Sequence, residues 1–71
     1  MRTNIPALRK QRRITQEELA GACGVSRQTI ISIENGKYVA SLPLAHKIAK
    51  FFSMKIEDVF ILEEELINGK V

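Results

Sequence analysis

Apolar residues recur every three or four positions along most of the chain, the spacing that puts side chains on one face of an α-helix. No segment shows the sustained alternation that is typical of a β-strand. The pattern predicts five helices, over residues 5–12, 16–23, 27–35, 42–52 and 56–60 or beyond. Their inward faces would form one core of Leu8, Leu19, Ala20, Cys23, Ile30, Ile33, Leu42, Ala45, Ile48, Ala49, Phe52, Ile56, Val59 and Phe60.

Residues that favour helix ends stand at the boundaries of these segments. Thr15 and Glu18 have the spacing of a capping box, in which each side chain bonds to the backbone N–H of the other residue. Ser26 and Ser41 are expected to cap the third and fourth helices through their hydroxyls. Gly24 would end the second helix, because glycine takes a positive φ without a Cβ clash.

Residues 16–35 have the arrangement of a helix-turn-helix. Two short predicted helices are joined by a three-residue turn, residues 24–26, with glycine at its first position. Ala20 lies where the two helices must cross closely, and a larger side chain there would push them apart. A generic pair of helices needs caps and a glycine, but it does not need this alanine as well.

Charge is distributed unevenly along the chain. The net charge of +3 divides into +6 over residues 1–50 (nine bases, three acids) and −3 over residues 51–71 (two bases, five acids). A basic body with an acidic end favours a polyanionic partner on one side of the molecule. A solvated surface is the alternative interpretation of the same charges.

The chain offers little for catalysis, metal binding or membrane insertion. Cys23 and His46 are the only cysteine and histidine, fewer than a zinc site or a disulfide framework needs. We therefore expect no catalytic residue, metal or cofactor, and no small-molecule ligand; Cys23 itself is expected in the core rather than as a redox sensor. No apolar run reaches the ~20 residues of a membrane span. Residues 1–6 lack the apolar stretch of a signal peptide, so a cytoplasmic protein is predicted.

Several segments match a known pattern together. They are Leu8-Arg9-Lys10, residues 14–20, residues 24–30, residues 33–38, Ser41-Leu42, Ala45, residues 47–50 and residues 56–60. In these segments the chain resembles the Cro/repressor (Xre) family of helix-turn-helix regulators, especially its short single-domain members. The resemblance implies a compact, five-helix, lambda-repressor-like DNA-binding domain over residues 1–60, followed by an acidic and apolar tail over residues 61–71.

The third helix would present a polar face to DNA. Turning it by about 100° per residue with Ile30 and Ile33 inward leaves polar side chains outward or on the flanks. These side chains are Arg27, Gln28, Thr29, Ser32 and Asn35. Such a helix fits the major groove, where Gln28 can pair with adenine and Arg27 with guanine or a phosphate. A solvated surface is the alternative for each of them.

The resemblance also implies roles for residues around this helix. Gln16 would contact a phosphate at the start of the second helix and brace Gln28. Asn35, Lys37 and Tyr38 would hold the backbone on the opposite side. These contacts would position the protein without reading the base sequence.

Glu34 points near the predicted core, where an unpaired carboxylate would be costly. The resemblance implies an ion pair between Glu34 and Arg9, which we interpret as structural. Arg13 stands where the family commonly has glycine, so the first helix would end on a strained or rearranged residue. Ser53 and Lys55 likewise depart from the usual glycine and serine around the last helix.

The end of the chain has two interpretations. Residues 56–67 can extend the last helix, or residues 60–63 can form a short strand beside residues 1–3. In either arrangement the apolar side chains exceed what one small domain can bury, which favours a partner. We therefore predict a homodimer that is joined through the last helix and the tail.

These expectations together predict a sequence-specific transcriptional regulator, most simply a repressor. It would bind a near-palindromic operator in double-stranded DNA as a homodimer, with residues 27–35 of each copy in the major groove. The alternative is an antitoxin-type protein-interaction module that also binds DNA and neutralises a partner enzyme through its acidic tail.

Overall fold

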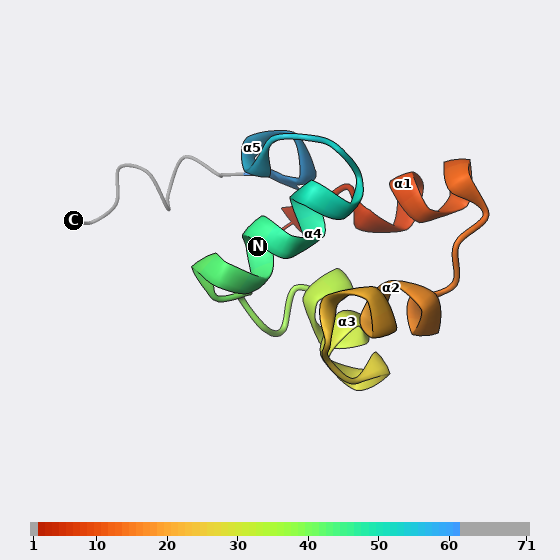
Figure 1. Ribbon diagram of the computed structural model, residues 1–71. Coiled ribbons are helices and arrows are strands. Elements are labelled where there is room, and N and C mark those ends of the chain that lie inside the picture. Colours follow the sequence, from red (N-terminus) through yellow and green to blue (C-terminus); the bar gives the residue numbers. More distant parts are fainter. Residues whose placement is uncertain (1, 62–71) are drawn as a thin grey trace.

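The structure is a computed structural model, and it describes residues 2–61 of the 71-residue chain (Figure 1). Within this range the elements follow in the order β1 (Arg2–Thr3), α1 (Ile5–Arg12), α2 (Gln16–Cys23), α3 (Arg27–Glu34), α4 (Leu42–Phe51), α5 (Ile56–Val59) and β2 (Phe60–Ile61). The predicted all-α, five-helix fold is confirmed, and each helix begins at the predicted residue. None of the helices in this range is both long and apolar enough to cross a membrane.

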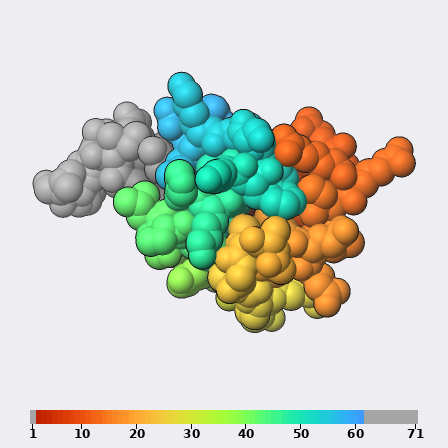
Figure 2. All heavy atoms as spheres, viewed as in Figure 1, coloured from red at the N-terminus to blue at the C-terminus, as the bar shows by residue number. Residues whose placement is uncertain are grey.

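Helix α4 occupies the middle of the molecule. It packs against α2 on one side and against α5 on the other (Figure 1). Figure 2 shows the side chains of α4, green to cyan, across the middle of this face, between α5 and α2. Helix α3 packs against α2 and also contacts β1, and one side of α3 stays outside the core.

Side-chain caps fix where the helices begin. The Thr15 hydroxyl accepts from the Glu18 N–H at 3.0 Å, and the Glu18 carboxylate accepts from the Thr15 N–H at 2.8 Å. The hydroxyls of Ser26 and Ser41 each accept from the backbone N–H three residues further on. The capping box and both serine caps are therefore confirmed.

Helices α1, α2, α3 and α4 end in the same type of turn. In each turn a residue with positive φ donates its N–H three residues back, and the next residue donates its N–H five residues back. The residue with positive φ is Arg13 (56°), Gly24 (73°), Gly36 (77°) or Ser53 (56°). Only glycine adopts this conformation without strain, so the predicted strained end of the first helix at Arg13 is confirmed.

The core is built from apolar side chains of all five helices and of β2. It consists of Ile5, Leu8, Leu19, Ala20, Cys23, Ile30, Ile33, Leu44, Ala45, Ile48, Ala49, Phe52, Val59 and Phe60. Ile5, which the apolar pattern left out, is fully buried, and Ile56 is only partly buried against this core.

The prediction of Leu42 as a core residue is wrong. Leu42 begins α4 with 74% of its surface exposed, whereas Leu44 is 8% exposed. The two leucines flank the stripe of Ala45 and Ile48 on opposite edges, so helical periodicity does not choose between them. Tertiary packing makes the choice, because the edge that carries Leu44 faces the other helices.

The two ends of the described chain lie side by side. Strands β1 and β2 pair antiparallel, with Arg2 opposite Ile61 and Thr3 opposite Phe60. The last helix stops at Val59 because Phe60 is already extended, at φ −107° and ψ 128°. A continued last helix is therefore wrong, and the short terminal strand is confirmed for residues 60–61. The predicted dimer contact in the tail falls largely on residues 62–71, outside the described residues.

Candidate nucleic-acid interface

Helices α2 and α3 form a closely packed pair. Ala20 is 3% exposed at their crossing, and Leu19, Ile30 and Ile33 are buried around it. The turn between the helices is closed by the Val25 N–H, which donates to the Ala20 carbonyl at 3.0 Å. Because small and aliphatic side chains fill this crossing, the orientation of α3 relative to the rest of the fold is fixed.

The outer side of α3 carries the polar side chains that the sequence predicted there. Arg27, Gln28 and Asn35 are exposed, while Thr29 and Ser32 are partly buried. Gln28 donates from Nε2 to the Ser32 Oγ at 3.3 Å, a long bond between two neutral groups. The polar surface that groove binding requires is therefore present and open to a partner.

The loop after α3 joins the same surface. Tyr38 lines a shallow hollow together with Ser26, Gln28, Thr29 and Ser32. The N–H groups of Lys37 and Tyr38 both donate to the Ser32 carbonyl, at 3.0 and 3.2 Å, and hold the loop against the end of the helix. Lys37 and Tyr38 are exposed. The structure thus brings the loop residues next to the outer face of α3.

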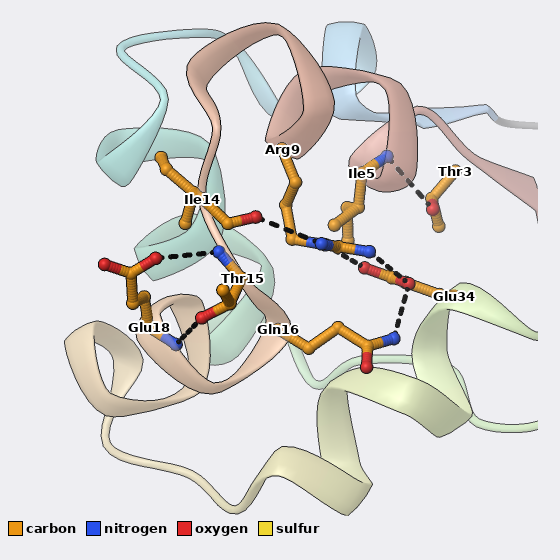
Figure 3. Close-up of polar contacts among 8 residues, drawn as sticks. All are labelled: Thr3, Ile5, Arg9, Ile14, Thr15, Gln16, Glu18 and Glu34. Carbon is orange, nitrogen blue, oxygen red and sulfur yellow. Dashed lines mark hydrogen bonds and ion pairs between the residues drawn. The ribbon is translucent and has the colours of Figure 1, made fainter.

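A polar cluster lies behind this surface, where α1, α2 and α3 meet (Figure 3). Arg9 donates from Nε and Nη2 to the two carboxylate oxygens of Glu34, at 2.7 and 3.2 Å. A third donor, Nη1 of Arg9, reaches the Ile14 carbonyl at 3.1 Å. The side chains of Arg9 and Glu34 are 19% and 7% exposed, so the carboxylate is nearly enclosed and its ion pair is present as expected.

Gln16 belongs to this inner cluster in the structure. Its Nε2 donates to the Glu34 Oε1 at 3.0 Å, while Gln28 bonds to Ser32 instead. The expected bracing contact between Gln16 and Gln28 is therefore absent from the described residues. A bond to a carboxylate is stronger than a bond to a neutral amide, which explains why Gln16 turns toward Glu34.

Sequence reasoning missed the role of Arg12. Its Nη2 donates to the Phe52 carbonyl at 2.7 Å, and its guanidinium lies 5.2 Å from the centre of the Phe52 ring. This contact joins the end of α1 to the end of α4 across 40 residues of sequence. A run of three bases within residues 10–13 gave no sign that this arginine differs from its neighbours.

Cys23 lies on the inner face of α2 and is 3% exposed. Burial raises the pKa of its thiol above the ordinary value of 9.0, and the nearby Lys47 acts in the opposite direction. A neutral, enclosed thiol fits the predicted core role better than that of a redox sensor.

Comparisons with known proteins agree with this geometry. A family model described as helix-turn-helix matches residues 6–59. The chain is 57% identical over 65 residues to an HTH-type transcriptional regulator of Methanocaldococcus jannaschii, covering 92% of this chain and 98% of that protein. It is 54% identical over 65 residues to an HTH-type transcriptional regulator of Bacillus subtilis, with the same two coverages. A cryptic-phage transcriptional repressor of Vibrio cholerae is 32% identical over 69 residues, which are 97% of this chain and 62% of that protein.

Proposed function

The chain belongs to the Xre/Cro-type helix-turn-helix family of transcriptional regulators, and we propose that it is a repressor that binds a near-palindromic operator as a homodimer. It would act on double-stranded DNA in the cytoplasm by binding and not by catalysis. The observation that carries this proposal is the exposed polar face of α3, held on a tightly packed pair of helices. A fixed helix with a free polar face is what direct readout of the major groove requires.

Base readout is assigned to the first two turns of α3. Gln28 is exposed and can exchange its 3.3 Å bond to Ser32 for a bidentate pair with adenine. Arg27, at the start of the helix, can reach guanine or a phosphate. Thr29 shares a 3.0 Å hydroxyl contact with the cap residue Ser26, which orients it at the edge of the surface.

Backbone contacts are assigned to residues on both sides of α3. Gln16 stands at the start of α2, where free N–H groups favour an anion. Asn35, Lys37 and Tyr38 follow the end of α3 and are exposed. Phosphate contacts at these two places would set the register of the helix in the groove.

Dimer formation and repression complete the proposal. Two copies of the 1–60 domain, joined through α5 and the tail 61–71, would present two α3 helices ~34 Å apart, one turn of duplex DNA. The similarity to a phage transcriptional repressor supports repression as the outcome. An operator overlapped by such a dimer would be closed to polymerase.

The test is selection of bound duplexes from a random DNA library by the full chain. The expected result is one enriched sequence with two inverted half-sites about 10 base pairs apart, bound by two chains. Analytical ultracentrifugation of the complex measures the stoichiometry, and in vitro transcription from a promoter carrying the site measures repression. A library that stays unenriched would remove sequence-specific binding, and a single half-site bound by one chain would remove the dimer.

A further inference from the structure

A basic groove lies between the end of α1 and the beginnings of α2 and α3. Its lining includes Arg9, Lys10, Arg13, Gln16, Glu17 and Arg27. The positive charge of Arg9 is paired with the carboxylate of Glu34. Within residues 2–61, no ion pair forms at Lys10, Arg13 or Arg27, so three positive charges face the groove against one negative charge from Glu17.

Arg13 occupies the groove at a cost in backbone conformation. It has φ 56° and ψ 45°, in the left-handed region that glycine adopts freely. The hydrogen bonds of the turn hold it there, since the Ile14 N–H donates to the Arg9 carbonyl at 2.9 Å. The Arg13 side chain is exposed and forms no ion pair within the described residues, so the charge at the edge of the proposed DNA surface is available to an anionic partner.

We propose that this groove binds a phosphate of the DNA backbone, with Arg13 as its main contact and Lys10 and Arg27 beside it. The proposal rests on the DNA-binding function proposed above, and it adds a contact on the α1 side of the helix-turn-helix. This phosphate would lie outside the base pairs that α3 reads, because the groove adjoins only the first residue of α3.

The chemistry of the lining favours a phosphate. Guanidinium groups bind phosphate through paired N–H donors, and the free N–H groups at the start of α2 face the same region. A phosphorylated small molecule would present the same group. We assign the groove to duplex DNA because Gln16 and Arg27 belong both to the groove and to the proposed DNA surface.

The first test compares two substitutions that suit their backbone equally. Arg13→Gly and Ser53→Gly both place glycine at φ 56° in the turn after a helix, but only the first removes a charge from the groove. Binding of the full chain to its selected duplex is measured between 50 and 300 mM salt. One lost phosphate contact is expected to reduce the log–log salt slope by about 0.9 and the affinity by roughly eightfold at 0.1 M salt. Ser53→Gly is expected to bind like the wild type.

The second test locates the phosphate. Single phosphates of the selected duplex are replaced in turn by neutral methylphosphonates. We expect one position, beyond the half-site bases, to weaken the wild type and to leave Arg13→Gly unaffected. If no position is coupled to Arg13, or if Arg13→Gly keeps the full salt slope, the proposal is overturned.

Different binding results would contradict this inference and the proposed function. If the wild type selects a duplex and loses it on Gln28→Ala, but Arg13→Gly binds normally, the regulator stands and the groove contact falls. If the wild type selects no duplex, both fall together.

Discussion

Two polar groups in and behind the helix-turn-helix each contain a glutamine, but in different surroundings. The inner cluster is Arg9, Gln16 and Glu34, and the outer pair is Gln28 and Ser32. In the inner cluster a nearly enclosed carboxylate accepts charge-assisted bonds from two of its neighbours, the shortest at 2.7 Å. The outer pair shares one bond of 3.3 Å between neutral groups.

The two glutamines differ in burial and in the charge of their partner. Gln16 is partly buried and bonded to a charged partner, whereas Gln28 is exposed and bonded weakly to a hydroxyl. Replacing a bond at the outer pair with a bond to a base costs little, while disturbing the inner cluster leaves a buried charge without a partner. Burial and the charge of the partner therefore separate Gln16, whose side chain is held by Glu34 beside the proposed backbone contact, from Gln28, which can exchange its partner for a base.

The largest expected effect comes from breaking the inner cluster. Glu34→Ala leaves the partly buried guanidinium of Arg9 without its carboxylate, which should destabilise the fold by about 2–3 kcal/mol. Thermal unfolding followed by circular dichroism should show a lower Tm by at least 8 °C, since each kcal/mol shifts Tm by about 4–8 °C in a domain of this size.

Glu34→Gln is the matched control for this substitution. It keeps an oxygen acceptor for Arg9 and removes the charge, so its loss of stability should be smaller than that of Glu34→Ala. The structural interpretation of the pair would be wrong if Glu34→Ala left the Tm unchanged and weakened only operator binding.

The next effect should appear in binding and not in stability. Gln28→Ala removes one exposed side chain with one weak bond, so the free energy of unfolding should change by less than about 0.5 kcal/mol. Affinity for the selected operator should fall by about 1–3 kcal/mol, the value of one bidentate base contact, and preference at one base pair should relax. Binding to unrelated duplex DNA should stay unchanged. An equal loss on both kinds of DNA would assign Gln28 to the backbone instead.

The sequence predicted the parts of this fold that are encoded locally. Thr15, Ser26 and Ser41 cap their helices through hydrogen bonds to the backbone N–H three residues further on. Such caps can be predicted without any tertiary information. The outer face of α3 was also predictable, because Ile30 and Ile33 fix which side of the helix turns inward.

The residue pattern alone did not predict the parts that depend on distant neighbours; the Arg9–Glu34 pair was expected only from the family resemblance. Leu42 and Leu44 are equivalent by periodicity, and packing alone buries the second. The bond that turns Gln16 toward Glu34 spans 18 residues, and the contact of Arg12 with Phe52 spans 40. A pattern of residue types does not show which distant residues meet in the fold. The contacts of Gln16 with Glu34 and of Arg12 with Phe52 could therefore not be predicted from it.

Arg12 is a solvent-exposed arginine with a structural contact, so exposure alone does not make a polar residue free. Arg12→Ala removes the bond to the Phe52 carbonyl and the ring contact, and it should cost about 1 kcal/mol. Urea unfolding measures this loss, with the exposed neighbour Gln11→Ala as a control that should leave stability unchanged. If Arg12→Ala and Gln11→Ala changed the free energy of unfolding equally, the contact of Arg12 with Phe52 would contribute nothing to stability.

The smallest expected effect is the pH dependence of stability that comes from the buried thiol of Cys23. Glu34 has hydrogen-bond partners in Arg9 and Gln16, whereas burial raises the pKa of the Cys23 thiol above 9.0, against a weaker opposite effect of Lys47. In the unfolded chain the thiol ionises at its ordinary pKa, so above pH 9 the unfolded state releases a proton that the folded state retains. The stability that Cys23 contributes is therefore present below pH 9 and is lost as the pH rises through its raised pKa. Urea unfolding between pH 7 and 10.5 should show wild-type stability falling more steeply above pH 9 than that of Cys23→Ala. Parallel curves would mean that burial on the inner face of α2 does not by itself keep a group neutral.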